Sequence, residues 1–178
     1  RAPRAADGAD RLVARTGIGI DSHAFAPGRR LVLGGVEIPH DAGLLGHSDA
    51  DVLAHAITDA LLGAAGLGDI GQHFPDTDER WRDADSLELL RAVVGQLADS
   101  GHTPANIDAT VACEEPKLGP FRDEMRTRLA EATGLDPGAV NVKFTTGERM
   151  GFVGRGEGIA ALAVATVTAA GRRSPRAP

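Results

Sequence analysis

The chain has 178 residues, 42% of them hydrophobic and 25% charged, with a formal net charge of −6, which is the profile of an ordinary globular protein. No block of Lys or Arg suggests a nucleic-acid partner, and the longest apolar run, 159–165, is far shorter than the roughly 20 residues of a membrane span. The single cysteine excludes an intrachain disulfide, which favours a cytoplasmic protein. From the charge pattern and the short apolar runs, we expect it to bind neither nucleic acid nor membrane.

The length predicts one domain. Residues 1–15 and 171–178 are rich in Arg, Ala and Pro, and we expect both to be disordered tails around a domain that spans 16–170.

Within this domain, stretches of period-2 alternation favour strands, and apolar residues recurring every three to four positions favour helices. Gly34-Gly35 between two short apolar runs is typical of a hairpin turn, and Ser48 three residues before Asp51 predicts a helix start. The predicted elements, in chain order, are a strand near 16–23, a hairpin over 31–38, helices over 48–65, 85–101 and 120–134, and strands at 107–113, 140–144 and 158–168. Their alternation predicts an α/β (α+β) fold in which helices pack on one face of a mixed sheet.

Asp21 and His23 are the first candidate metal ligands, because side chains two residues apart in a strand point the same way. His55 is the third, with Asp51 and Asp59 one helical turn away as possible hydrogen-bond partners of its ring. An Asp/His/His set leaves one tetrahedral position open, as catalytic zinc does, although the spacing equally permits manganese, cobalt or iron. Taken singly, a surface aspartate and a solvated helical histidine remain the simpler interpretations.

Three further segments carry polar groups suited to a phosphorylated substrate. Residues 46–49 open the predicted helix, where free N–H groups and the side chains of His47 and Ser48 suit a phosphate, although Ser48 also fits a plain helix cap. Acids in 69–71 and 74–78 suit the hydroxyls of a polyol, or a network of turns. Thr146 and Glu148 suit a phosphoryl oxygen and a magnesium ion, or a solvated strand end.

Together these segments resemble the 2-C-methyl-D-erythritol 2,4-cyclodiphosphate synthase family, and they occur in the family's order across 16–170. The residues that carry the resemblance are Asp21-Ser22-His23-Ala24-Phe25, Leu44 to Asp51, His55 to Gly63, Gly68-Asp69-Ile70-Gly71, Phe74-Pro75-Asp76-Thr77-Asp78, Pro116-Lys117-Leu118, Thr145-Thr146-Gly147-Glu148 and Gly151 to Gly158. In one departure from the family's neutral, Gln-containing stretch, this chain has Cys113-Glu114-Glu115 before Pro116.

The resemblance implies a ferredoxin-like or chorismate-mutase-like sandwich that forms a homotrimer with active sites between subunits. It implies Zn²⁺ on Asp21, His23 and His55, and Mg²⁺ or Mn²⁺ on Glu148 together with substrate phosphates. It also implies a set of substrate-binding residues: Asp21, His23, His47, Ser48, Asp69, Ile70, Gly71, Phe74, Pro75, Asp76, Thr77, Asp78, Cys113, Pro116, Lys117, Leu118, Gly119, Thr145, Thr146, Glu148, Phe152 and Arg155. Phe152 and Arg155 would line a central channel, where an isoprenoid phosphate is a possible ligand.

The reaction implied is a lyase step of non-mevalonate isoprenoid biosynthesis. The substrate, 4-diphosphocytidyl-2-C-methyl-D-erythritol 2-phosphate, cyclises with loss of CMP, assisted by His47 and Thr146. Two alternatives stay open: a metal-dependent phosphoesterase that activates water, and a non-catalytic trimer that binds metal or nucleotide.

Overall fold

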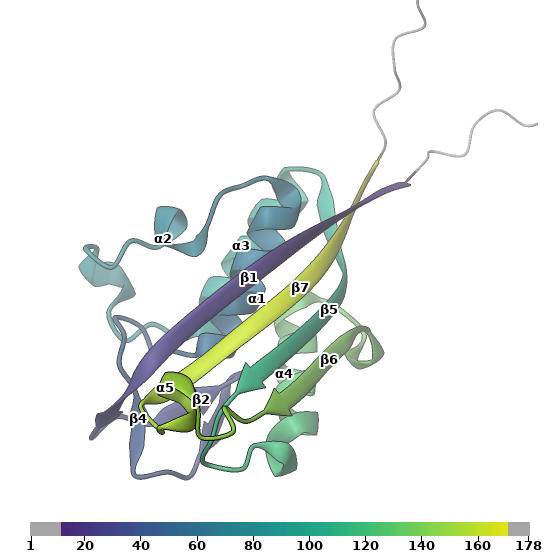
Figure 1. The fold of residues 1–178 in the computed structure, drawn as a ribbon. Coiled ribbons are helices and arrows are strands. Elements are labelled where there is room, and N and C mark those ends of the chain that lie inside the picture. The colour runs from purple at the N-terminus through teal and green to yellow at the C-terminus, as the bar shows by residue number, and fades with distance from the viewer. Residues whose placement is uncertain (1–11, 171–178) are drawn as a thin grey trace, which may run out of the picture.

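The computed structural model describes residues 12–170, and its centre is a five-stranded sheet of order β4-β1-β7-β5-β6 (Figure 1). β5 and β6 are parallel and the other neighbours are antiparallel, so the sheet is mixed, as predicted. A separate hairpin pairs β2 with β3 around Gly34-Gly35, also as predicted. The elements are β1 (Leu12–Pro27), β2 (Leu31–Leu33), β3 (Val36–Ile38), β4 (Ala42–Leu44), α1 (Val52–Ala65), α2 (Ile70–His73), η1 (Glu79–Trp81), α3 (Ser86–Asp99), β5 (His102–Ala112), η2 (Gly119–Phe121), α4 (Arg122–Thr133), η3 (Pro137–Ala139), β6 (Val140–Thr145), α5 (Gly151–Gly154) and β7 (Gly158–Ala170).

The helices α1, α3 and α4 cover one face of the sheet and bury the core between the two layers (Figure 1). The apolar face predicted for α1 is buried throughout: Val52, Leu53, Ala56, Ile57, Ala60, Leu61 and Ala64. None of the helices in residues 12–170 is both long and apolar enough to cross a lipid bilayer.

Strand β1 contacts α1 closely because it presents glycines to the helix. A Cβ built on Gly19 would lie 2.0 Å from the carbonyl oxygen of Ala56, and one on Gly17 would lie 2.1 Å from that of Ala60. Glycine alone therefore fits at these two positions, and the side chains of the alternate residues point to the opposite face of the sheet.

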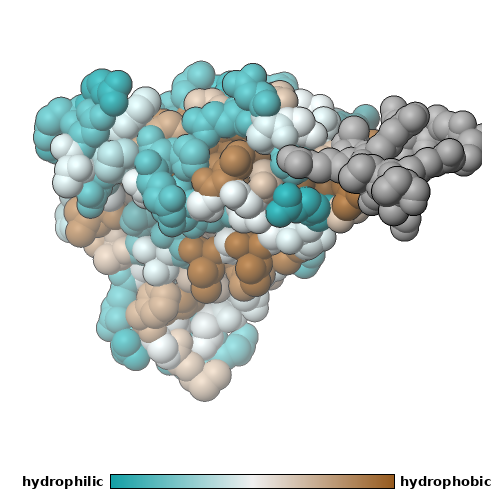
Figure 2. Space-filling view, turned by 90° about the horizontal axis from the view of Figure 1, so that it is seen from above, coloured by the Kyte–Doolittle hydropathy of each residue, from teal (hydrophilic) through white to brown (hydrophobic). Residues whose placement is uncertain are grey.

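That opposite face carries large apolar side chains that no other element of the described residues covers. Ile18 and Ile20 on β1 are 66% and 69% exposed, and their partners in the register are Val164 and Leu162 on β7. Figure 2 shows hydrophobic side chains gathered on this side of the molecule, below a mainly hydrophilic surface. A hydrophobic sheet face of this kind is typical of a surface that another protein chain covers.

Several predicted elements differ from the structure: β1 extends to Pro27, β4 was not predicted, and β5 begins at His102 and not near residue 107. β1 begins at Leu12, so residues 12–15 pair with β7 instead of forming part of a tail, whereas 1–11 and 171–178 lie outside the described residues. α1 is capped by Asp51 and not by Ser48, because the Asp51 carboxylate accepts from the N–H groups of Leu53 and Ala54. The predicted loop after α1 contains the short helix α2, which Asp69 caps.

Candidate functional site

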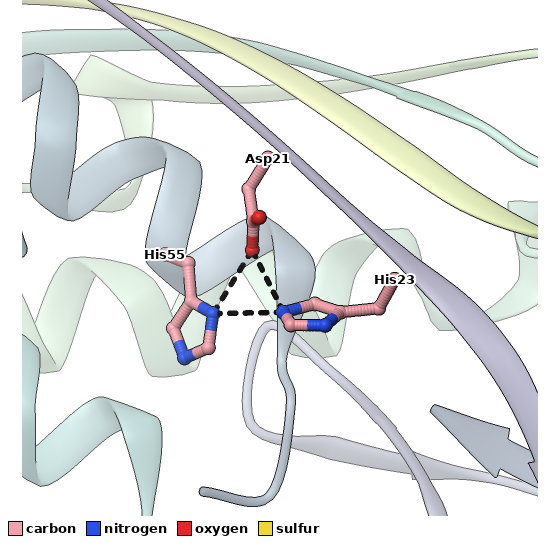
Figure 3. A group of neighbouring side chains, drawn as sticks. All are labelled: Asp21, His23 and His55. Atoms are coloured by element: carbon pink, nitrogen blue, oxygen red, sulfur yellow. Dashed lines mark hydrogen bonds and ion pairs between the residues drawn. The ribbon is translucent and has the colours of Figure 1, made fainter. Parts of the chain in front are cut away.

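Asp21, His23 and His55 form one cluster at the point where β1 passes over α1 (Figure 3). The Asp21 carboxylate lies 3.0 Å from His23 Nε2 and 2.9 Å from His55 Nδ1, and the two ring nitrogens are 3.3 Å apart. Asp21 and His23 come from the face of β1 that looks toward the helices, and His55 comes from the second turn of α1. The structure thus brings together the three ligands that the sequence predicts.

The chemistry of this donor set fits a divalent cation. His23 Nδ1 lies 2.7 Å from the carbonyl oxygen of Leu45, which can only accept, so the ring proton of neutral His23 is on Nδ1 and a lone pair on Nε2 points into the cluster. His55 Nδ1 points to the same place. Two imidazole nitrogens and a carboxylate oxygen lie within 4.8 Å of one another, so the group can hold either a shared proton or a metal ion, and nitrogen and carboxylate ligands of this kind suit a divalent cation.

The ionisation of Asp21 supports this arrangement. Burial alone would raise the pKa of Asp21, but the hydrogen bonds and charges of His23 and His55 outweigh burial and hold that pKa far below its usual range. The Asp21 carboxylate is therefore anionic over the whole physiological pH range.

The hydrogen-bond partners expected for His55 are wrong. Asp51 is fully buried as the cap of α1, and Asp59 accepts the N–H of Ile70 at 2.7 Å. His55 Nε2 instead lies 2.9 Å from the hydroxyl oxygen of Ser86, a residue at the start of α3. The Asp51 carboxylate also accepts the N–H groups of Leu53 and Ala54, so these two groups are not free to bind the phosphate predicted at the start of α1.

A cavity of about 280 Å³ opens directly beside the metal cluster. His47 and Ser48 line it as predicted, with the His47 ring held by the carbonyl oxygen of Asp78 at 3.1 Å. The other lining residues are His23, Gly46, His55, Ile70, Phe74, Asp76, Trp81 and Leu89. We refer to this cavity as the metal-side cavity.

The predicted polyol segments contribute only part of their residues to this cavity. Ile70, Phe74 and Asp76 line it, whereas Asp69 caps α2 and Asp78 caps η1 and pairs with Arg80. The residues of these segments outside the lining are Asp69, Gly71, Pro75, Thr77 and Asp78. For Asp69 and Asp78 the turn network that the composition allowed is therefore the better description.

A second cavity, of about 310 Å³, lies where β5 and β6 end. It collects the residues predicted for the nucleotide: Cys113, Pro116, Lys117, Leu118, Gly119, Thr145 and Thr146. We refer to it as the strand-end cavity, and within the described chain it has no lining residue in common with the metal-side cavity.

Thr146 and Glu148 contact each other at the rim of the strand-end cavity. The Thr146 hydroxyl donates to the Glu148 carboxylate at 2.6 Å, and Glu148 is exposed with a left-handed backbone, φ 50°. Phe152 lies in the short helix α5 that follows and is 42% exposed, and Arg155 caps the C-terminal end of α5 and is ion-paired to Glu157 at 2.7 Å.

Comparison with known proteins decides the family. Residues 14–168 match the YgbB family model. The chain is 59% identical over 156 residues to a 2-C-methyl-D-erythritol 2,4-cyclodiphosphate synthase of Salinibacter ruber, covering 88% of this chain and 99% of the relative. The chain belongs to the YgbB family of 2-C-methyl-D-erythritol 2,4-cyclodiphosphate synthases.

Other members of the family are longer. The chain is 65% identical over 149 residues to a bifunctional enzyme IspD/IspF of an Anaeromyxobacter species, which covers 84% of this chain but only 38% of the relative. Among solved structures, the bifunctional IspDF of Campylobacter jejuni matches with a TM-score of 0.86 at 45% identity, covering 89% of this chain and 43% of that one. A 2C-methyl-D-erythritol-2,4-cyclodiphosphate synthase solved with CDP bound matches with a TM-score of 0.79 at 38% identity, covering 86% and 99%. The chain thus spans about two fifths of the bifunctional relatives and nearly all of the single-function ones.

Glu114 and Glu115, the two acids by which the chain departs from the family's pattern before Pro116, both lie outside the lining of the strand-end cavity. The Glu114 carboxylate accepts the N–H of Gly147 at 3.0 Å. The thiol of Cys113 donates to the carbonyl oxygen of Glu115, and burial raises its pKa to about 11, so Cys113 is not a nucleophile.

Sequence reasoning missed several lining residues. Trp81 and Leu89 complete the apolar wall of the metal-side cavity, and Arg122 adds a second cation beside Lys117 in the strand-end cavity. The Arg122 guanidinium lies 5.2 Å from the centroid of the Phe144 ring. Arg122 was detectable as a basic residue just after the Pro120 that opens the third helix, whereas Trp81 and Leu89 give no signal that separates them from core residues.

Proposed function

We propose that this chain converts 4-diphosphocytidyl-2-C-methyl-D-erythritol 2-phosphate into 2-C-methyl-D-erythritol 2,4-cyclodiphosphate and CMP, the lyase step of the non-mevalonate isoprenoid pathway. The observation that carries the proposal is the Asp21-His23-His55 cluster, which opens onto a cavity in a chain 59% identical to a synthase over that enzyme's whole length. The match to a synthase with CDP bound supports a cytidine diphosphate ligand.

Asp21, His23 and His55 would hold zinc, and Glu148 would give a carboxylate oxygen to a magnesium or manganese ion. Bound there, these ions would neutralise and orient the phosphates, which is the template role of a metal pair. Lys117 and Arg122 would add fixed positive charge around the diphosphate in the strand-end cavity.

The bond changes require little acid–base chemistry. An oxygen of the 2-phosphate attacks the β-phosphorus, the bond from that phosphorus to the oxygen of the α-phosphate breaks, and CMP leaves with that oxygen. The attacking oxygen is already an anion, so His47 and Thr146 would act as donors to the phosphoryl oxygens and not as bases. Holding one substrate folded in this geometry is worth about 7 kcal/mol or more of the barrier, which the walls of the two cavities would supply.

The complete active site would lie between two subunits of a homotrimer. Two separate cavities on one chain, each with half of the predicted site, support this arrangement, and so does the uncovered apolar sheet face around Ile18 and Ile20. Phe152 and Arg155 would then lie near the trimer axis, where an isoprenoid phosphate is a candidate ligand, although Arg155 is already paired with Glu157.

The test of the reaction is phosphorus NMR of the protein incubated with the cytidine diphosphate substrate, zinc and magnesium, with and without a chelator. CMP together with a cyclic diphosphate, both lost on chelation, is the expected result. CMP with a linear phosphate product would identify a phosphoesterase instead, and no turnover by metal-loaded protein would favour a binding protein.

Subunit mixing tests where the active site lies. His55→Ala removes a metal ligand and Lys117→Ala removes a cation of the other cavity, so each variant alone should be inactive. If each site takes one cavity from each of two subunits, co-expressed variants regain activity, in roughly a quarter of the sites for random mixing in a closed ring. Activity confined to one chain would give inactive mixtures.

A further inference from the structure

Buried Ser86 and half-buried Asp49 form a hydrogen-bonded pair behind His55. Ser86 is the first residue of α3 and is fully buried, and Asp49 lies in the loop before α1. The Ser86 N–H donates to Asp49 Oδ2 at 3.1 Å, and the Ser86 hydroxyl makes a short contact with Asp49 Oδ1. Asp49 Oδ1 also accepts the N–H of Asp51 at 3.1 Å, so both carboxylate oxygens already accept backbone donors.

The direction of the hydrogen bond between Ser86 and Asp49 follows from these contacts. A carboxylate whose oxygens both accept N–H groups is an acceptor, so the single proton of the Ser86 hydroxyl points to Asp49. The Ser86 oxygen therefore presents only lone pairs to His55 Nε2, 2.9 Å away. His55 Nε2 must then carry the ring proton, and His55 Nδ1 must carry the lone pair.

This choice of tautomer matters because His55 Nδ1 is the nitrogen that points into the metal cluster, 2.9 Å from Asp21. The opposite tautomer would place a proton between the ring and the ion. The other hydroxyl near His55 Nε2, that of Ser48, is farther away at 3.2 Å and itself accepts the N–H of Ala50. The Ser48 hydroxyl can turn its proton toward His55 or toward Ser86, whereas the hydroxyl proton of Ser86 is held by Asp49.

We propose that Ser86, held by Asp49, is a positioning residue that fixes the ring orientation and tautomer of His55 for metal binding. This inference rests on the proposed zinc site. It extends the functional unit from the strand and helix that carry the ligands to the start of α3, which carries none of them. Groups that hydrogen-bond a metal-bound histidine in this way typically change metal affinity 10–100-fold when they are removed.

The test is zinc affinity, measured by competition with a chromophoric chelator on the purified protein, without substrate. Ser86→Ala should weaken zinc binding about 10–100-fold, and Asp49→Asn should also weaken it, because an amide nitrogen in place of an oxygen would let the Ser86 proton turn toward His55. Ser86→Thr keeps the hydroxyl and should restore most of the affinity. The matched control is Thr133→Val, which removes a buried hydroxyl bonded to the Leu129 carbonyl in α4 and should leave zinc affinity unchanged.

The outcomes separate this inference from the proposed function. Failure of the wild-type protein to bind zinc would overturn the metal site itself. Zinc binding by wild type that is equally tight in Ser86→Ala and Asp49→Asn would overturn only the role of Ser86. The visible absorption spectrum of the cobalt-substituted protein gives a second readout, since altered ligand geometry in Ser86→Ala should change bands that Thr133→Val leaves alone, and circular dichroism shows which variants are folded.

Discussion

Asp51 joins the start of α1 to the turn between β2 and β3, and we predict that replacing it weakens the fold in a graded way. Its carboxylate is fully buried and accepts four backbone N–H groups: Gly34 at 2.9 Å, Gly35 at 2.7 Å, Leu53 at 3.1 Å and Ala54 at 3.0 Å. Both glycines have positive φ, so the turn itself depends on residues without a side chain.

The magnitude follows from counting the donors that each variant leaves without a partner. Asp51→Ala loses a helix cap, worth about 1 kcal/mol, and leaves the buried N–H of Gly34 and the half-buried N–H of Gly35 without an acceptor, at about 1–3 kcal/mol each, a total of roughly 3–7 kcal/mol. Asp51→Asn keeps one acceptor oxygen for Gly34 and the helix, but turns an amide NH₂ toward the N–H of Gly35, and so costs about 1–3 kcal/mol. Zinc affinity should fall as well in Asp51→Ala, because His55 lies one turn into the helix that Asp51 caps.

Urea unfolding of chelator-treated protein, followed by circular dichroism, measures these costs. The matched control is Asp85→Asn: Asp85 caps α3 through one bond, to the N–H of Leu87, and is exposed, so asparagine should replace it with little change. Equal stability of Asp51→Asn and wild type, or a cost in Asp85→Asn as large as in Asp51→Asn, would refute the reasoning.

Three further predictions concern the strand, the second cavity and the metal. Gly19→Ala should lower the melting temperature and the zinc affinity, because the added methyl pushes α1 away from β1. The control Gly95→Ala in α3, where a Cβ meets nothing within 4 Å, should change neither. Calorimetry measures the melting temperature, and chelator competition measures the zinc affinity. Glu114→Ala should weaken CDP binding, measured by titration calorimetry, because it frees the N–H of Gly147, and Glu114→Gln should keep most of the affinity. Burial would lower the pKa of His23, but its bond to a carboxylate outweighs burial and raises that pKa above the ordinary 6.5. The charged pair therefore stabilises metal-free protein below about pH 6.5 and is lost as pH rises through the raised pKa, so chelation should lower the melting temperature more at about pH 8 than at about pH 6; equal shifts would contradict this.

Much of the fold was predictable because the hydrophobic periods are long and the turn residues are specific. Gly34-Gly35 indicated the hairpin, the helix predicted over 85–101 corresponds to α3, and the burial of α1 follows its apolar spacing. The start of β1 was missed because residues 12–15 lack alternation of their own and are strand only through pairing with β7. The cap of α1 was misassigned because Ser48 and Asp51 are equally good caps in sequence, and only the contact of Asp51 with the hairpin turn distinguishes them.

The grouping of Asp21, His23 and His55 was predictable from residue type, spacing and the family resemblance together, whereas the hydrogen-bond partners of His55 were not. An acid one turn from His55 on the same helix is the natural guess for a hydrogen-bond partner, but Asp51 and Asp59 both satisfy backbone donors instead. The true partner, Ser86, is 31 positions away in sequence and is brought close by the packing of α3 on α1. Spacing rules describe one element at a time, so contacts between elements are beyond them.

Strand β1 explains why the metal site and the uncovered sheet face occur in the same protein. Its inward side carries glycines, so α1 approaches closely enough for His55 to meet Asp21, and a larger residue at Gly19 would separate them. Side chains alternate along a strand, so the large β-branched residues that favour strand formation, Ile18 and Ile20, lie on the outward side. Close strand–helix packing, which brings the three cluster residues together, thus leaves apolar side chains on a face that no other element within residues 12–170 buries. The same alternation that allows the metal cluster to form on one side of the sheet leaves an apolar surface on the other, as the proposed division of the site between subunits would require.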